Sequence, residues 1–493
     1  MFSILEEFIT YTRKRQNISN LALSCLLIFS HLWALPNRWY LLILVLFIGG
    51  SWLINNNLML AFWHCYLTIL PFQRSRQFMA AEIAVEMTDR LFVKHYDYFV
   101  RFSDLLLGVF AYLLIREKRT YKKNELISPT AFKFEKVLLL LLIVFAGVSV
   151  GLSTFFGFAL FNLLLFCGIL FHYVLAQSVT NNYKFWQITW IGISLHVGMM
   201  LLLMFIQFYR GSQLGIELEH KDSYNPFGAT AIEENSLFRA AGYFHDPNAA
   251  ATWLLSLSPL ALWFVWQLTR KKELVYLLSL ITGTGVVVTG SRVAWLVLMV
   301  NVVYMFLRFY KYWLSEFRYL KKYYRLLGVF LLLLILTTSF VAKRVWSTTH
   351  TLQEGGGVDY RKNQIMVSVV ILKAQPFGLG LGMLQFEVWS SSLQEKYTTD
   401  ITQPHNVFAE IGSGLGVFGL LLFCLLIYLL FRRAIGDFLR LNNFFSLVIL
   451  LALFNYFFMA NFYPYLLRSP LAEFFWLFSG IIFSTKKLLS KNV

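Results

Sequence analysis

Long apolar runs, almost free of charge, recur along the whole of this sequence. Three of the clearest are Val137 to Leu152, Phe155 to Ala176 and Phe408 to Phe431. A helix needs about 20 apolar residues to cross a bilayer, so runs of this length predict membrane spans. Hydrophobic residues make up 58% of the chain and charged residues only 14%, whereas a soluble domain carries about 25% charged residues. The sequence therefore excludes a water-soluble globule.

We predict an all-α fold, a polytopic transmembrane helical bundle of about 12–14 spans with large periplasmic loops. The expected spans are 19–35, 38–55, 58–72, 102–115, 137–152, 154–176, 185–209, 249–268, 273–289, 293–309, 326–341, 406–431, 443–461 and 469–486. The first span contains Leu21 to Leu35, follows three basic residues and lacks a small-residue cleavage site. We therefore expect an uncleaved signal anchor there.

The basic residues predict how the chain is oriented in the membrane. The net charge is +17, but the Lys and Arg residues fall in short clusters between apolar runs and do not form a separable basic domain. Such clusters favour the cytoplasmic side, which predicts cytoplasmic termini and no nucleic-acid partner. Each cysteine lies inside an apolar run, so neither disulfides nor a thiolate metal site is expected at Cys25, Cys65, Cys167 or Cys424.

Three segments on the opposite side are too long for tight turns: 73–101, 210–248 and 342–405. Loops of this length usually carry a function. The first mixes apolar and charged residues and predicts an amphipathic helix at the membrane interface. The other two contain the candidate functional residues.

The end of segment 210–248 contains an unexplained arginine. Asp246 and Pro247 suit the N-cap and first position of a helix, so that part of the motif only has to start the next span. Starting a helix does not require Arg239, whose guanidinium offers five donors to an anion. Arg292 follows in a short turn between two spans, where it either snorkels to lipid phosphates or faces a ligand.

Segment 342–405 contains a second arginine of this kind. Arg361 lies near the start of an apolar helix, where the helix dipole disfavours a cation, and this favours a functional or paired role. A run of alternating glycines follows, at Gly378, Gly380 and Gly382. It lacks the preceding strand and the crossover unit of a nucleotide-binding loop. It therefore predicts a turn that lets the backbone approach another element closely. His405 stands before a span containing Glu410 and four glycines, which we expect to permit close helix packing.

Together these pieces resemble the O-antigen ligase and O-antigen polymerase superfamily of bacterial membrane glycosyltransferases. The resemblance runs from about Arg239 to Gly419 and comprises Arg239 with Gly242, Phe244, Pro247 and Asn248; Gly290 to Trp295; Arg361 with Pro376, Gly378, Gly380 and Gly382; and His405, Asn406, Glu410, Gly412, Gly416 and Gly419. On this basis we expect N-terminal transmembrane helices over 1–209, an O-antigen ligase-like core over 210–431 and C-terminal helices over 432–493. The chain departs from the family pattern in its extra predicted spans.

The resemblance implies an enzyme of the bacterial inner membrane that transfers a glycan from an undecaprenyl diphosphate carrier. It implies that the diphosphate is bound by Arg239, Arg292 and Arg361 and that His405 activates the acceptor hydroxyl, with supporting roles for Asn248, Asn406 and Glu410. The acceptor would be the lipid A core, in a ligase, or the growing glycan, in a polymerase. We favour the ligase, and membrane lipids are the other expected partners.

We expect a metal-independent inverting glycosyltransferase that uses no cofactor. No carboxylate cluster of metal-ligand type is evident, so arginines would stabilise the charge of the leaving diphosphate. Glu233, Glu234 and Asp246 are alternative bases. Other interpretations remain open: protein glycosylation, a transporter or flippase of lipid-linked glycan, and a metal-dependent enzyme using His245, Asp246 and His405.

Overall fold

The structure is a computed structural model of the whole chain. It describes residues 16–28, 37–70, 75–87, 90–121, 134–179, 183–212, 214, 238–244, 246–317, 328, 337–338, 341–342, 356–391, 404–441, 444–462 and 471–484. Contacts between Cα atoms divide the chain into two compact units, and each is described by itself. The predicted division at 209 and 431 follows the sequence resemblance and stays a prediction.

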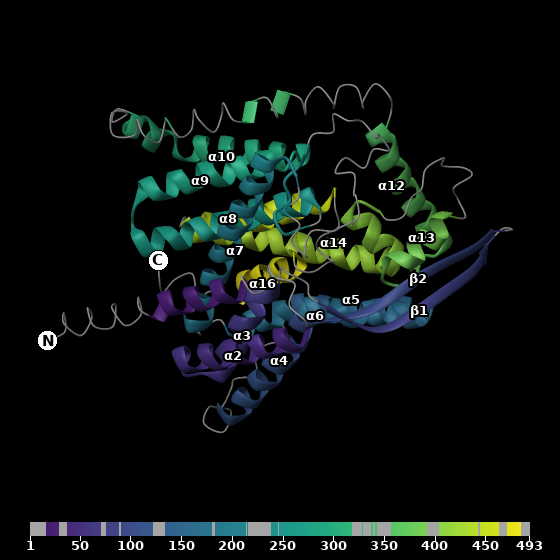
Figure 1. The fold of residues 1–493 in the computed structure, drawn as a ribbon. Helices are drawn as coiled ribbons and strands as arrows, with labels where there is room; N and C mark the ends of the chain where they lie inside the picture. Colours follow the sequence, from purple (N-terminus) through teal and green to yellow (C-terminus); the bar gives the residue numbers. More distant parts are fainter. Residues whose placement is uncertain are drawn as a thin grey trace. The chain divides into compact units, whose positions relative to one another are not determined.

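Unit 1 combines N-terminal helices with the helices around residues 181–344. Its helices are Gln16–Ile28, α2 (Asn37–Asn55), α3 (Leu58–Ile69), α4 (Phe102–Tyr121), α7 (Tyr183–Arg210), α8 (Pro247–Thr269), α9 (Lys272–Val288) and α10 (Arg292–Phe317). Its centre is aromatic, because the fully buried Trp63 of α3 stacks on Phe185 of α7 at 4.6 Å and donates to Thr189 Oγ1 at 3.0 Å. Helices α8, α9 and α10 pack against one another (Figure 1).

Unit 2 contains a β-hairpin and the C-terminal helices. Its elements are β1 (Ser75–Met87), β2 (Arg90–Arg101), α5 (Phe134–Gly151), α6 (Phe156–Ser178), α12 (Gly356–Ala374), α13 (Met383–Ser391), α14 (Val407–Leu441), α15 (Phe444–Ala460) and α16 (Leu471–Ser484). Helix α14 packs against α5, α12, α15 and α16, and it forms the spine of the unit.

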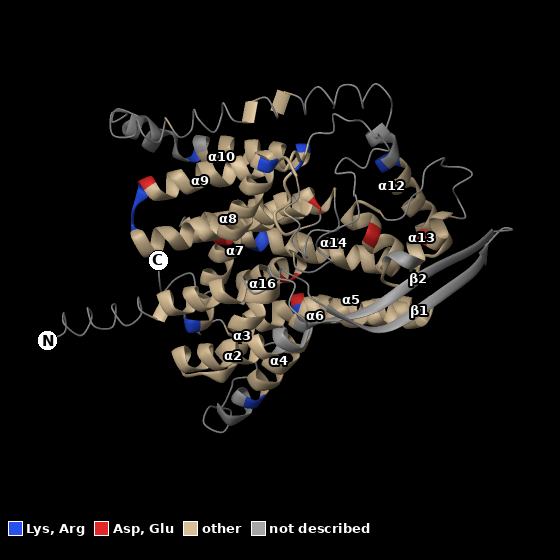
Figure 2. Cartoon of the chain, in the orientation of Figure 1, with Lys and Arg blue, Asp and Glu red and all other residues tan. Residues whose placement is uncertain are grey.

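The described helices have the properties of membrane helices. By length and composition, five could cross a bilayer, namely α5, α6, most of α7, α8 and α14, and seven shorter apolar helices accompany them. Large apolar side chains face outward, including Leu53, Leu26 and Leu46, and Figure 2 shows charged residues mostly near helix ends. The predicted all-α polytopic membrane fold is confirmed. The predicted span 326–341 lies almost entirely outside the described residues.

The interfacial helix expected over 73–101 is wrong. These residues form the two-stranded sheet β1–β2. Only two residues separate the strands, as in a tight hairpin. The second strand is rich in aromatic and β-branched residues, which favour strands over helices.

Candidate functional site

Arg239 is buried in unit 1 and bonded to protein. Its side chain is 8% exposed. Its Nε donates to the Thr289 carbonyl at 2.7 Å and its Nη2 to Asn248 Oδ1 at 3.1 Å. The neighbouring Ala240 N–H also donates to the Val288 carbonyl at 3.2 Å. Arg239 therefore ties the turn between α9 and α10 to the start of α8.

The start of α8 orients Asn248 toward this guanidinium. Asp246 is the N-cap, accepting from the Asn248 N–H at 2.9 Å, and Pro247 occupies the first turn. The same carboxylate oxygen accepts from Asn248 Nδ2 at 3.0 Å, which leaves the amide oxygen directed at Arg239. The predicted helix-starting role of Asp246 and Pro247 is confirmed, and Asn248 lies beside Arg239 as a supporting residue would.

The turn between α9 and α10 presents Arg292 at the surface. Gly290 adopts a positive φ of 63°, and its N–H donates to Val287 O at 3.0 Å. Trp295 Nε1 donates to the same carbonyl at 3.1 Å. Arg292 is exposed and is the first residue of α10. Arg239 and Arg292 thus belong to one structure, the "arginine turn", comprising Arg239, Asn248 and residues 289–292.

Gln207 was not predicted, yet it holds the segment that bears Arg239. This buried side chain accepts from the N–H groups of Ala241 and Gly242 at 3.1 and 2.8 Å, and it donates to the Gly242 carbonyl at 2.7 Å. Gly242 has a positive φ of 61°, and a Cβ there would lie 2.0 Å from Met200 Sδ. The sequence feature that could have indicated Gln207 is its amide side chain near the end of an otherwise apolar span.

In unit 2, the glycine run joins its backbone to an interruption in α14. Gly416 has φ 74° and ψ −173°, which breaks the helix. Across the break, the N–H groups of Leu379 and Gly380 donate to the carbonyls of Ser413 and Gly414 at 2.8 and 3.0 Å. The Val417 N–H donates to the Pro376 carbonyl at 2.9 Å. These bonds satisfy the backbone groups that a broken helix leaves without intrahelical partners. We call residues 376–380 with 413–417 the "glycine junction".

Only glycine fits at the closest points of this junction. A Cβ on Gly378 would lie 2.4 Å from the Gly414 oxygen, and one on Gly416 would lie 2.2 Å from the Pro376 oxygen. Both are backbone atoms, which no side-chain rotation can move aside. The prediction that the glycine run lets backbone approach another element is confirmed. At Gly414 and Gly416, α14 closely approaches the turn that follows α12.

The glycine junction lies at the level of a turn between two spanning helices. Ser149, near the end of α5, accepts from the Gly380 N–H at 2.8 Å and donates to the Gly414 carbonyl. Gln385 Nε2 lies 3.5 Å from Ser153 Oγ in the turn between α5 and α6. Helices α5 and α6 are long and apolar enough to span a bilayer, and a turn between two spans lies at a face of the bilayer. We therefore expect the junction at a membrane boundary.

Arg361 and His405 are brought to one end of unit 2. The Arg361 guanidinium lies 5.4 Å from the centroid of the Phe462 ring. The preceding residue, Asn461, accepts at its carbonyl from Asn406 Nδ2 at 3.0 Å. Asn406 also caps α14, since its Oδ1 accepts from the Phe408 and Ala409 N–H groups at 2.9 and 3.1 Å. His405, the residue before it, is half-buried.

Glu410 lies one turn into α14 at this same end. Its N–H donates to the Asn406 carbonyl at 2.9 Å, its side chain is half-buried and its Oε2 is enclosed. We call Arg361, His405, Asn406, Glu410 and Phe462 the "histidine cluster". The sequence-predicted residues of unit 2 therefore converge, through Asn461 and Phe462, which the sequence did not single out.

Some predicted alternatives lie outside the described residues, namely Glu233, Glu234 and His245. Within the described part of the chain, no three His, Cys, Asp or Glu side chains gather closely enough to hold a metal ion. Asp246, a reserve base, is engaged in capping α8.

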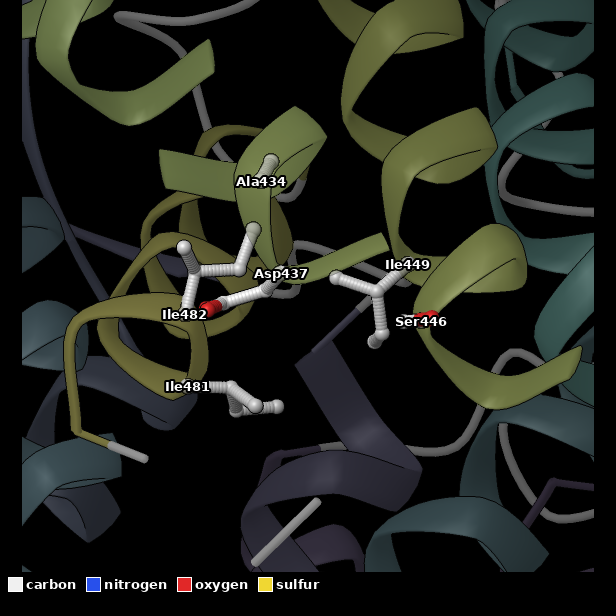
Figure 3. Close-up of a pocket in the computed structure, with 6 residues that line it drawn as sticks. All are labelled: Ala434, Asp437, Ser446, Ile449, Ile481 and Ile482. Atoms are coloured by element: carbon white, nitrogen blue, oxygen red, sulfur yellow. The ribbon is translucent and has the colours of Figure 1, made fainter. Parts of the chain in front are cut away.

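A small pocket lies far from the histidine cluster. It is lined mainly by apolar side chains, with Asp437 facing it beside Ile482 (Figure 3): Ala434, Asp437, Ser446, Ile449, Ile481 and Ile482. Asp437 accepts from Arg433 Nε at 3.1 Å. At about 1.5 Å per helical residue, this pocket is some 45 Å along α14 from its start, so it is not the site of the predicted chemistry.

Comparison with known proteins matches part of the chain to a family model. Residues 277–424 match a family model described as O-antigen ligase. No curated protein matches the chain. The matched segment contains Arg292, the glycine junction and, except for Phe462, the whole histidine cluster, while Arg239 precedes it. The match supports a function of the O-antigen ligase or polymerase type. Over residues 277–424 the chain thus carries the features of the O-antigen ligase superfamily, as its motifs predict.

Proposed function

We propose that this protein transfers a glycan from an undecaprenyl diphosphate carrier to an acceptor hydroxyl at the outer face of the bacterial inner membrane, and that it is an O-antigen ligase of lipopolysaccharide. The observation that carries the proposal is the convergence of Arg361 and His405 at one end of unit 2, in a matched segment that meets the membrane boundary. A lipid-borne donor presents its headgroup at such a boundary.

The reaction replaces one bond at the anomeric carbon of the donor sugar. The acceptor oxygen attacks that carbon, and the bond to the diphosphate oxygen breaks. The attacking hydroxyl loses its proton to His405, and the diphosphate leaves with its bonding electron pair. We propose Nε2 as the nitrogen that takes the proton, because Nδ1 is enclosed by protein. General base catalysis of this kind is worth about 10²- to 10⁴-fold in rate.

An arginine side chain is well suited to stabilise the leaving diphosphate. A guanidinium is permanently charged and can donate two parallel hydrogen bonds to phosphate oxygens. Fixed positive charge facing the departing diphosphate lowers the barrier electrostatically. The Arg361 guanidinium lies within cation–π distance of the Phe462 ring, a contact that helps to hold it in place.

The role of Arg239 is refined by its contacts. Two of its donors hold Thr289 O and Asn248 Oδ1. We therefore propose that Arg239 positions the arginine turn, on which Arg292 is exposed. Binding of the diphosphate by Arg292 stays a prediction. A direct contact between Arg239 and the diphosphate stays a prediction. No metal ion or cofactor takes part in the proposed steps.

A gene deletion distinguishes the candidate activities. In a ligase mutant, long glycan accumulates on the lipid carrier while the lipid A core stays bare; in a polymerase mutant, single repeat units still reach the core. Complementation with wild type should restore the lipopolysaccharide ladder, and Arg361→Ala or His405→Ala should not. An unchanged ladder and carrier pool in the deletion strain would refute both activities for this glycan and favour a transporter or a protein glycosyltransferase.

A further inference from the structure

In the described part of unit 2, one buried side-chain amide has no hydrogen-bond partner for either of its polar atoms. The side chain of Gln364, on α12, is 1% exposed, and both its Oε1 and its Nε2 lack partners among the described residues. A side-chain amide offers two donor hydrogens and an acceptor oxygen. Burying them without partners costs free energy, so such a group calls for an explanation.

Two buried hydroxyls on the same pair of helices, α12 and α14, are hydrogen-bonded. Ser368 Oγ donates to the Gln364 carbonyl at 2.9 Å, and Ser413 Oγ donates to Ala409 O at 2.7 Å. The buried Gln207 of unit 1 makes three hydrogen bonds. The buried Gln385 of unit 2 keeps one contact, from its Nε2 to Ser153 Oγ, while its Oε1 has no partner among the described residues. Gln364 differs from these residues because neither atom of its side-chain amide has a partner among the described residues.

Its place on α12 puts Gln364 beside the histidine cluster. Residues three apart on a helix are neighbours, and Gln364 is three residues after Arg361. The C-terminal end of α12 is fixed against α14 by the glycine junction, while Arg361, near the other end, lies over Phe462 beside the Asn406 contact. Both helices therefore start at the end where the histidine cluster lies.

We infer that Gln364 binds a polar group of the donor sugar next to the diphosphate, an inference that rests on the proposed function. A sugar hydroxyl or acetamido group both donates and accepts, which matches an amide; a phosphate oxygen only accepts. Arg361 meets the diphosphate, and the amide one turn further along α12 meets the adjoining sugar. Enclosure by protein strengthens such bonds and makes the site selective, because a sugar lacking the group leaves the amide unpaired.

Two substitutions form a matched pair. Gln364→Leu removes the amide while keeping similar bulk. Gln375→Leu makes the same change at an exposed position at the opposite end of α12. Without ligand, we expect Gln364→Leu to unfold at a temperature equal to or above that of the wild type, because it removes an unsatisfied buried amide. A clear fall for Gln364→Leu, with none for Gln375→Leu, would mean that the amide has a structural partner and would overturn the inference.

Binding then tests the sugar contact. The probes are undecaprenyl diphosphate carrying the glycan and undecaprenyl diphosphate alone, each titrated against the purified full-length protein. Gln364→Leu should weaken binding of the sugar-bearing carrier by about three- to tenfold, the worth of one neutral hydrogen bond, and leave binding of the bare carrier unchanged. Equal losses for both carriers would assign the amide to the diphosphate, and no loss would remove it from the site; either result overturns the sugar assignment.

Turnover separates this inference from the proposed function. If the wild type binds the carrier but transfers no glycan, the transferase proposal is refuted. The contact between Gln364 and the sugar is then decided by the binding data alone. With an active wild type, Gln364→Leu should raise KM for the donor more than it lowers kcat, and a donor lacking the contacted hydroxyl or acetamido group should show no further loss with this variant.

Discussion

Replacing Gly416 with alanine tests the glycine junction, where α14 breaks against the turn after α12. The residue adopts φ 74° and ψ −173°, a region almost restricted to glycine, so alanine would be strained by about 1–3 kcal/mol. Its Cβ would lie 2.2 Å from the Pro376 oxygen and 2.5 Å from the Phe377 carbonyl carbon. Moving these atoms apart breaks the bond from Val417 N–H to Pro376 O, worth about 0.5–1.5 kcal/mol.

These terms predict a destabilisation of about 2–4 kcal/mol. For a unit of this size that corresponds to a fall in Tm of roughly 5 to 15 °C. The control is Gly436→Ala, in the same helix, where a Cβ would meet nothing within 4 Å. Alanine there should be neutral or stabilise by about 0.5–1 kcal/mol, because glycine weakens a helix. Tryptophan fluorescence during heating of the detergent-solubilised protein measures both, and equal Tm values for Gly416→Ala and wild type would refute the junction.

Three further predictions concern the candidate site. Arg361→Ala should abolish glycan transfer, and Arg361→Lys should restore only part of it because lysine lacks the two-pronged donor geometry. The control Arg433→Ala, at the far end of α14, should leave transfer intact, whereas full activity of Arg361→Ala would exclude contact between Arg361 and the diphosphate. His405→Ala should lower kcat by about 10²- to 10⁴-fold with little change in donor binding, whereas a loss confined to binding would contradict a role as base. Arg239→Met should destabilise the protein by about 1.5–3 kcal/mol, the worth of a charged hydrogen bond to Thr289 O, and normal stability with lost donor binding would instead favour direct contact between Arg239 and the diphosphate.

The helices were predictable because their signal is local. Apolar length and flanking charge are properties of one segment, and the predicted spans such as 154–176 and 249–268 coincide with α6 and α8. The hairpin over β1 and β2 was missed because strand pairing joins two segments. The mixture of charged and apolar residues in 73–101 suits a surface helix when the segment is considered alone, and only the close pairing of its two halves makes it a sheet.

The site was predictable where a residue type was out of place in its segment. Arg239, Arg361 and His405 stood out because a charged or titratable side chain at a membrane boundary needs a reason. Gln207 and Gln364 did not stand out, since an amide in an apolar span violates no local pattern. Their importance depends on what lies around them: three backbone groups around Gln207, and no partner for Gln364 among the described residues.

The glycine junction indicates how deep in the membrane the candidate site lies. Helix α14 has 35 residues, about 52 Å at 1.5 Å per residue, which exceeds the roughly 30 Å hydrocarbon core. A span of about 20 residues counted back from Phe431 begins near Gly412, so the break at Gly416 lies close to the boundary and the helix start carrying His405 extends beyond it. We therefore expect the histidine cluster to lie above the apolar core. Under the proposed function, a sugar hydroxyl would approach it there from water while the carrier lipid stays in the bilayer. A transporter would need charged or broken elements near the middle of the membrane; in the described part of α14 the interruption lies near one edge, which favours transfer at the surface over passage through the bilayer.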